Sequence, residues 1–414
     1  MKEEITEIRQ NPIRSAMNVF FMVLTLILYS DFFNFGFWAD TPGPKIQLAY
    51  GALCMMAAFV GFQRMPKDYP TRKIVLALIA LLVMSLIASL MIGGYSQGTK
   101  KPIFMIMGFG MFFNLWQLKI TEKQIITGFV IFGLMTFAIQ IWQMSMEFPV
   151  FGLDYEMESG EIGERNDLAR YMVGTYFVAV LCVYYFWSRI IKKFNIFAAV
   201  MLAVFLVSVY LYLTRQLMIA IALSALLSIF ILGDRKKQIA AFMLILVLGA
   251  VVFLNAKAIF GDMLEDTDDS TNIRWQCMDY IRKQLELHIE YIPFGRGFGD
   301  YEKAWAAKGY YISDIGFVGQ VFVLGIFWTV SYFVIAYKFL TKLRHDIPMY
   351  VTLFVFGSLV TCLFIFPYRN MVEAFIWATL FYISSIHLAK AEEEEAEEDD
   401  EEAEDEEEKR EITA

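Results

Sequence analysis

The chain has 414 residues, of which 58% are hydrophobic and 19% charged, and its mean hydropathy is +0.51. These values exclude an ordinary soluble domain and predict a membrane protein. The net charge of −9 comes from residues 391–414, where sixteen acidic residues meet two basic ones, so that residues 1–390 alone carry about +5. We expect 391–414 to be a disordered cytoplasmic tail, because it is a block of like charge without apolar periodicity.

Twelve hydrophobic stretches, each long enough to cross a hydrocarbon core of roughly 30 Å, follow one another along the chain. They are residues 16–37, 46–62, 74–92, 102–118, 124–144, 167–187, 194–213, 216–232, 238–254, 316–340, 349–366 and 370–389. The predicted fold class is an all-α polytopic membrane protein, with one large external loop over residues 255–315. The division at Thr214 and Arg215 is the least clear, because one long kinked helix there would reverse the sidedness of everything after it.

Lysine and arginine gather in the short segments on one side of these stretches, for example in residues 63–73, 188–193 and 338–346. Short cytoplasmic segments are rich in these residues, so the alternation supports a hairpin at Arg215 and places both termini in the cytoplasm. The acidic loop 145–166 and the long loop that follows the ninth stretch then lie outside.

Cysteine and histidine give no sign of metal or redox chemistry. The four cysteines form no CxxC pair, and only Cys277 lies in an external loop, so no disulfide is expected. Of the three histidines only His288 is external, and the chain has no HExxH motif or His/Cys cluster. We expect neither a metal nor a cofactor, and no nucleic-acid partner.

The long external loop contains the residues that bear most directly on function. Residues 272–292 predict an amphipathic helix that rests on the membrane or on the mouth of the bundle, because seven of its side chains fall within one arc of the helix. This face consists of Arg274, Met278, Ile281, Leu285, His288, Ile289 and Ile292. Arg282 lies at the border of that face, where a substrate contact and an ordinary ion pair with Glu286 are equally acceptable interpretations. Arg296 lies in a glycine-rich turn, residues 293–301, which predicts a tight turn and does not match a nucleotide-binding fingerprint.

Further polar residues lie where the predicted spans meet the external side. Arg215 is at the outer tip of two spans, where an ionisable group is either functional or extends to the interface. Arg165 precedes the sixth span, and Arg369 between the last two spans is a binding residue or a simple interface anchor. Tyr311, like other aromatic residues near this surface, offers a face for sugar stacking or belongs to the interfacial aromatic belt.

Read in chain order, five segments resemble the O-antigen polymerase and O-antigen ligase superfamily of polytopic membrane proteins. They are ERNDLARYM (164–172), YLTRQLMIAIALS (212–224), NIRWQCMDYI (272–281), PFGRGFGDY (293–301) and SDIGFVGQVFVLGIF (313–327). The resemblance covers roughly residues 160–330 by motif and most of the chain by topology. It rests on the order and spacing of the segments, because no single one is specific.

The resemblance implies roles for individual residues. Arg215 and Arg274 match the two family arginines that bind the lipid pyrophosphate. In the ligase branch the last segment opens with a histidine, where this chain has Asp314 at the same spacing before Val318 and Gly325. The resemblance therefore implies the polymerase branch, with Asp314 as the proton acceptor or the group that orients the attacking hydroxyl. A helix N-cap is the alternative role for Asp314.

We therefore expect a metal-independent membrane glycosyltransferase. It would be a polysaccharide polymerase that joins polyprenyl-diphosphate-linked repeat units of O-antigen, capsule or exopolysaccharide on the outer face of the bacterial inner membrane. The alternatives are a ligase of the same superfamily and a transporter or flippase, for which Asp31 and Glu373 would be the ionisable groups within spans. The expected partners are the lipid-linked glycan, membrane lipid, a flippase and a chain-length regulator.

Overall fold

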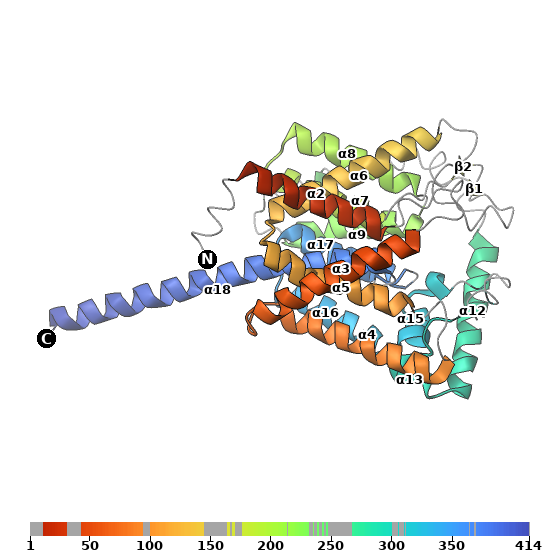
Figure 1. Cartoon of the computed structure of the whole chain (residues 1–414). Helices are drawn as coiled ribbons and strands as arrows, with labels where there is room; N and C mark the ends of the chain where they lie inside the picture. The colour runs from red at the N-terminus through yellow and green to blue at the C-terminus, as the bar shows by residue number, and fades with distance from the viewer. Residues whose placement is uncertain are drawn as a thin grey trace.

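The computed structural model is helical almost throughout (Figure 1). It describes residues 11–30, 43–93, 100–144, 164–165, 168–169, 176–212, 214–231, 235, 238–239, 242–243, 246, 267–299, 305, 310, 312–363, 365–367 and 370–413. Within these residues there are fourteen α-helices and one short antiparallel hairpin, in which β1 (Glu164–Arg165) pairs with β2 (Leu168–Ala169). The prediction of an all-helical fold is confirmed for this part of the chain.

Eleven of the twelve predicted spans contain helices, although the sixth, predicted over residues 167–187, includes strand residues Leu168 and Ala169 and is helical only from Tyr176. The helices are α2 (Pro12–Tyr29), α3 (Gly43–Arg64), α4 (Arg72–Gly93), α5 (Lys100–Leu118), α6 (Glu122–Met144), α7 (Tyr176–Lys192), α8 (Ile196–Leu211), α9 (Arg215–Ile231), α15 (Gly316–Leu324) with α16 (Ile326–Thr341), α17 (Met349–Thr361) and α18 (Met371–Thr413). The twelfth, residues 238–254, lies outside the described residues except for isolated positions.

Five of these helices are long and apolar enough to cross a membrane, and four shorter helices are also apolar. The five are the segments Pro12–Tyr29, Lys45–Arg64, Arg72–Ile92, Glu122–Trp142 and Met371–Ala396. Large apolar side chains such as Met91 and Phe230 are exposed on the outside of the bundle, where water would disfavour them and lipid would not. The chain is therefore a helical membrane protein of the multi-pass type, while the count of twelve spans stays a prediction.

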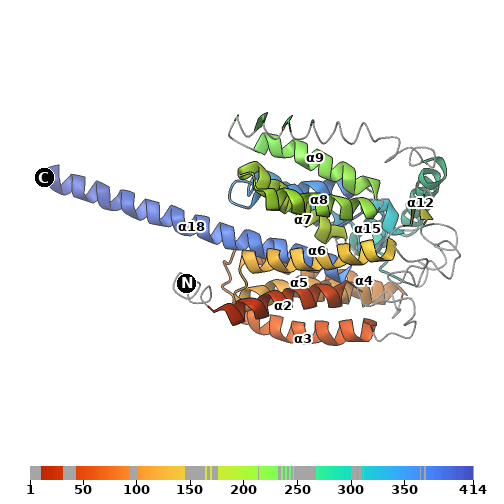
Figure 2. The ribbon, with the colours of Figure 1, turned by 90° about the horizontal axis from the view of Figure 1, so that it is seen from above.

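The apolar part of α18 runs through the middle of the bundle, where α5 packs along it (Figures 1 and 2). Gly108 of α5 permits the close approach, because a Cβ at this position would lie 2.7 Å from the Cβ of Ala374. On the other side α17 packs against α7 and α9. A helix that is apolar on all faces is expected in such a buried position.

Two further predicted elements differ in the structure. The span predicted over residues 316–340 is two helices, because Gly325 has φ 89° and ψ 169°, a backbone conformation that essentially only glycine adopts. The tail expected to be disordered continues α18 as helix to Thr413. Glutamate and alanine favour helix, and the buried half of α18 supplies a helix already formed, so the tail needs no nucleation step of its own.

The bundle has two distinct ends (Figures 1 and 2). α2 begins and α18 projects at one end, called here the tail end. The β1–β2 hairpin and the helix α12 (Thr267–Leu287) lie at the opposite end, called here the loop end. This arrangement follows from helices that alternate in direction through the bundle.

Candidate functional site

The helix α12 forms the outer layer of the loop end, where it packs against α15 and the short 3-10 helix η2 (Ile312–Ile315). It matches the amphipathic helix predicted from the sequence. Ile281 is fully buried on its inner face, whereas Trp275 on the outer face is 66% exposed. The prediction was wrong for Ile289, which is exposed because the helix ends two residues earlier. It also missed Cys277, which is buried on the inner face.

Arg274 is half-buried on α12, one turn before the buried Cys277. Residues three apart share one face of a helix, so Arg274 lies at the edge of the face that packs on the bundle. This position agrees with the interpretation that its guanidinium is directed toward the protein and away from bulk water.

Arg282 has a different environment on the same helix. Its guanidinium donates to Asp279 Oδ1 at 2.7 Å and to Glu286 Oε1 at 3.0 Å, and the side chain is exposed. The hydrogen bonds from Lys283 and from Arg282 lower the pKa of the Asp279 carboxyl. The ion-pair interpretation therefore describes Arg282 in this structure.

The glycine-rich turn joins the external loop to the broken helix. The backbone N–H of Arg296 donates to the carbonyl of Phe322 at 2.7 Å, and that of Gly297 donates to Val323 at 2.9 Å. Breaking a helix inside a membrane exposes carbonyl groups that must find donors, and the turn supplies two. The backbone of this segment therefore satisfies the end of α15, while the tight turn predicted over residues 293–301 stays a prediction because its last two residues lie outside the described ones.

Gly295 and Gly325 make this contact possible from its two sides. Gly295 has φ 79° and ψ 167°, close to the values of Gly325. A Cβ on Gly295 would collide with the backbone of Val323, and one on Gly325 would collide with the carbonyl of Pro293. We call these two residues, with the two hydrogen bonds between the turn and α15, the glycine clasp.

Aromatic rings pack further described residues of the loop against α15. The ring of Trp305 stacks on Phe322 with centroids 5.3 Å apart, and it meets Tyr280 of α12 edge-on at 4.8 Å. Tyr291 packs edge-on against Phe322, and the guanidinium of Arg296 lies 5.8 Å from the centroid of the Tyr291 ring. Because Trp305 is buried, its role in the structure is packing within the protein.

Asp314 belongs to η2, directly before α15, and is described by its backbone alone. The residue at the cap position of α15 is Ile315, which has no side-chain hydrogen bond to the helix. The amide of Phe317 in the first turn donates to the carbonyl of Cys362, 2.9 Å away. Asp314 therefore lies one residue before the cap position, on an element held against the end of α17.

Arg215 is the first residue of α9, also described by its backbone alone. α8 ends at Leu211 and α9 begins at Arg215, so two helices with a short turn replace the alternative of one long kinked helix. The turn is anchored by Thr214, whose buried hydroxyl donates to the carbonyl of Tyr212 at 3.1 Å.

The structure thus brings together the elements that carry Arg274 and Asp314, since α12 contacts η2 directly. The helix that begins with Arg215 packs on α17, whose end contacts the start of α15. Arg165 lies in β1 and is described by its backbone only, whereas Tyr311 and Arg369 lie outside the described residues. Asp31 also lies outside them.

The sequence singled out Glu373 only for the transporter alternative, but the structure shows that its side chain is buried. Glu373, in the first turn of α18, is only 2% exposed, and its backbone N–H donates to Asn370 Oδ1 at 2.9 Å. The amide of Asn370 lies 3.4 Å from Glu373 Oε1. The spacing Asn-x-x-Glu before an apolar run is a helix-start signal that could have located this pair at the beginning of α18.

Among the described residues, no group of three histidine, cysteine or acidic side chains is placed to hold a metal ion. Comparison with known proteins finds no family model and no curated protein that matches the chain.

Proposed function

We propose that this chain is a polysaccharide polymerase that joins oligosaccharide repeat units carried on a polyprenyl diphosphate. The observation that supports it most is the meeting of three features at the loop end. A half-buried arginine, Arg274, lies on a helix that contacts η2, η2 carries Asp314, and a broken helix follows immediately. Irregular backbone at membrane depth is tolerated where it is buried in protein or lines a cavity, so the break is a suitable place for a substrate at the membrane surface.

In the proposed reaction a hydroxyl of the acceptor glycan attacks the anomeric carbon of the donor glycan. A new glycosidic C–O bond forms while the C–O bond to the diphosphate breaks, and the polyprenyl diphosphate leaves with the bonding electrons. Arg215 and Arg274 would stabilise the charge that grows on the diphosphate, because guanidinium groups can hold phosphate oxygens through two hydrogen bonds. The carboxylate of Asp314 would accept the proton of the attacking hydroxyl.

The membrane arrangement that goes with this function has twelve spans in the bacterial inner membrane, with the tail end in the cytoplasm and the loop end outside. The basic segments identified in the sequence support this orientation. A flippase would deliver the lipid-linked units to the outer face, and a chain-length regulator would limit the polymer. Reporter fusions after Glu158 and Asp269 should then report the external side, and a fusion after Lys390 the cytoplasm.

A transporter is the second candidate, because two observations favour it. Transporters bind substrates at discontinuous helices, and the pair α15–α16 is such a helix. Glu373 is also a buried carboxylate in a membrane-embedded bundle. Arg215 and Arg274, however, belong to segments of the loop end, whereas transporter sites lie near the midplane.

A deletion strain distinguishes the candidates through what accumulates on the carrier lipid. Loss of a polymerase leaves single repeat units on the carrier at the outer face. Loss of a ligase leaves full-length polymer on the carrier, and loss of a transporter leaves single units at the cytoplasmic face. Full-length polymer in the deletion strain would reject the polymerase proposal, and complementation with the intact gene is the control.

A further inference from the structure

A buried glutamine of the broken helix has an unpaired side-chain oxygen. Gln320 lies in the middle of α15 and is 4% exposed. Its Oε1 atom is buried, and no described residue donates a hydrogen bond to it. Inside a membrane bundle such an atom is unfavourable, because neither water nor lipid replaces the bond that it lacks. An unpaired buried polar group of this kind indicates a place where a ligand or a water molecule supplies the missing bond.

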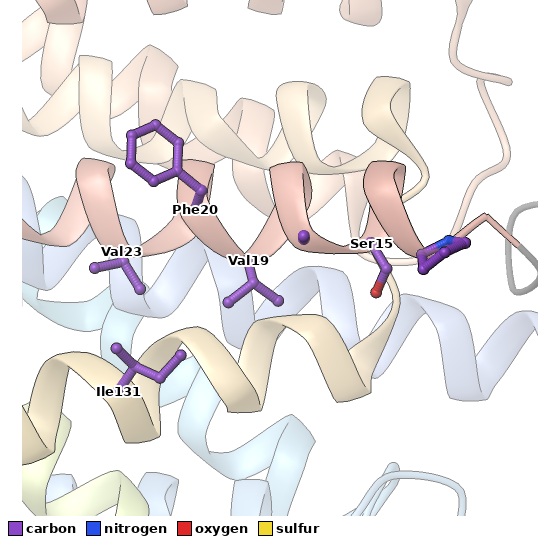
Figure 3. A pocket seen from close by; sticks show the side chains of 7 residues that line it. Ser15, Val19, Phe20, Val23 and Ile131 are labelled. Carbon is purple, nitrogen blue, oxygen red and sulfur yellow. The ribbon is translucent and has the colours of Figure 1, made fainter.

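Two other buried glutamines show how a structural carboxamide is paired in this bundle. Gln124 Nε2 donates to Ser15 Oγ at 3.1 Å, at the start of the apolar groove between α2 and α6 that Figure 3 shows. Gln140 Oε1 accepts a hydrogen bond from Ser208 Oγ at 2.7 Å. Each of these amides joins two helices, whereas Gln320 Oε1 has no such bond to any described residue. A role in helix packing therefore does not explain Gln320.

The position of Gln320 on α15 brings its amide beside the proposed site. Gly316 and Gln320 are four residues apart, so they share one face of the helix. A Cβ on Gly316 would collide with the carbonyls of Cys362 and Leu363, so this face lies against the end of α17. Long side chains of a helix point back toward its N-terminus. The amide of Gln320 therefore lies over the first turn of α15, which directly follows η2 and Asp314.

The two ends of α15 are held in different ways. The glycine clasp fixes its last turn to the external loop. At its start Gly316 has φ 51°, a left-handed conformation that glycine adopts readily, and the amide of Phe317 donates to the carbonyl of Cys362 at 2.9 Å. Small residues at the end of an element commonly serve as hinges. A rotation at Gly316 would uncover the amide of Gln320 while the clasp stays closed.

We propose that Gln320 is a specificity-determining residue that binds an uncharged hydroxyl of the acceptor glycan. The hydroxyl donates to Gln320 Oε1 and thereby holds the glycan beside Asp314, which accepts the proton of the attacking hydroxyl. A carboxamide carries no charge, so a charged group of the glycan would lose its hydration here without gaining an ion pair. The substrate class is therefore a glycan with a neutral hydroxyl near the attacking group. This inference rests on the proposed function.

Gln320→Met tests the proposal, because methionine has nearly the same length and lacks the amide. The purified full chain in nanodiscs is supplied with a polyprenyl-diphosphate-linked repeat unit. The KM for this unit should rise about tenfold, as expected for one lost hydrogen bond. The kcat should change less than about twofold, because the bond is present both before and in the transition state. The thermal unfolding midpoint should rise by about 2–4 °C, because an apolar side chain replaces an unpaired amide.

Gln140→Met is the matched control. Its amide is paired with Ser208, so the midpoint should fall while the KM stays at the wild-type value. A lower midpoint in Gln320→Met would show that the amide is structural, and a wild-type KM would show that it does not bind the glycan; either result would overturn the proposal. A wild type that makes no polymer at all would instead overturn the proposed function, and this inference with it.

Discussion

The two ends of the bundle are built from different interactions. At the tail end, polar side chains from separate helices bind one another: Tyr350 donates to Glu122 at 2.8 Å, His387 lies 2.8 Å from the same carboxylate, and Thr71 bonds to Ser385 at 2.7 Å. At the loop end, backbone groups and aromatic rings hold the elements together through the glycine clasp and the rings around Phe322.

The two ends therefore differ in whether charged side chains take part in helix packing. The carboxylate of Glu122 on α6 binds Tyr350 of α17 and His387 of α18. It therefore stabilises the contact between these helices and has few acceptor positions left for a ligand. At the loop end, packing that requires no charge positions α12 and η2, the elements that carry Arg274 and Asp314. We therefore expect substitutions at the tail end to affect stability, and substitutions of the polar residues at the loop end to affect the proposed activity.

The largest effect is expected from Gly325→Ala. The methyl group would collide with the carbonyl of Pro293 in a backbone conformation reserved for glycine, which should cost about 3 kcal/mol or more. The thermal unfolding midpoint in detergent, and the protein level in membranes, should both fall. Ser331→Ala on α16 is the control, since its hydroxyl bonds only locally to Trp328. An unchanged midpoint in Gly325→Ala would show that the glycine clasp does not stabilise the protein.

Asp314→Asn should lower polymer synthesis in isolated membranes by about 100-fold, in line with the contribution of a general base. The protein should remain at its normal level, because asparagine has nearly the same size and shape as aspartate. Asp346→Asn, an exposed aspartate in the loop before α17, is the matched control and should leave the rate unchanged. Wild-type rates in Asp314→Asn would reduce Asp314 to a structural residue.

Arg274→Lys and Arg215→Lys should each lower the polymerisation rate by about tenfold or more. Lysine keeps the charge but loses the planar pair of donors that fits a diphosphate. Arg282→Lys on the same helix should change the rate less than about twofold, because Arg282 forms an exposed ion pair. If all three lysine variants polymerise equally well, the arginines do not bind the leaving group.

The smallest effect on activity is expected at the tail end. Glu122→Gln should lower the free energy of unfolding by about 1.5–3 kcal/mol, the size of a hydrogen bond to a charged group, while the polymerisation rate stays at the wild-type value. His387→Gln should have a similar effect, and the double variant should cost less than the two together because the residues share one interaction. A strong loss of activity in Glu122→Gln would contradict the division between the two ends.

The sequence predicted the helices well and the site only in part. The spans follow from long apolar runs, and the amphipathic face of α12 follows from the spacing of apolar residues along the chain. The break at Gly325 could not be predicted, because glycine within an apolar run is also compatible with a continuous helix and only the docked turn at Gly295 explains the break. The hydrogen bonds of Glu122 could not be predicted either, because local patterns do not show contacts between distant residues. Tyr350 and His387 follow Glu122 by 228 and 265 positions in the chain.

The central claim is that the loop end transfers glycan from a polyprenyl diphosphate. The most direct measurement uses the purified full chain in nanodiscs, supplied with a polyprenyl-diphosphate-linked repeat unit, with glycan length and free polyprenyl diphosphate followed in time. The account predicts a ladder of longer glycans, one polyprenyl diphosphate released per bond formed, and loss of both products in Arg274→Lys. If the folded protein releases no polyprenyl diphosphate and leaves the units single, the claim is contradicted.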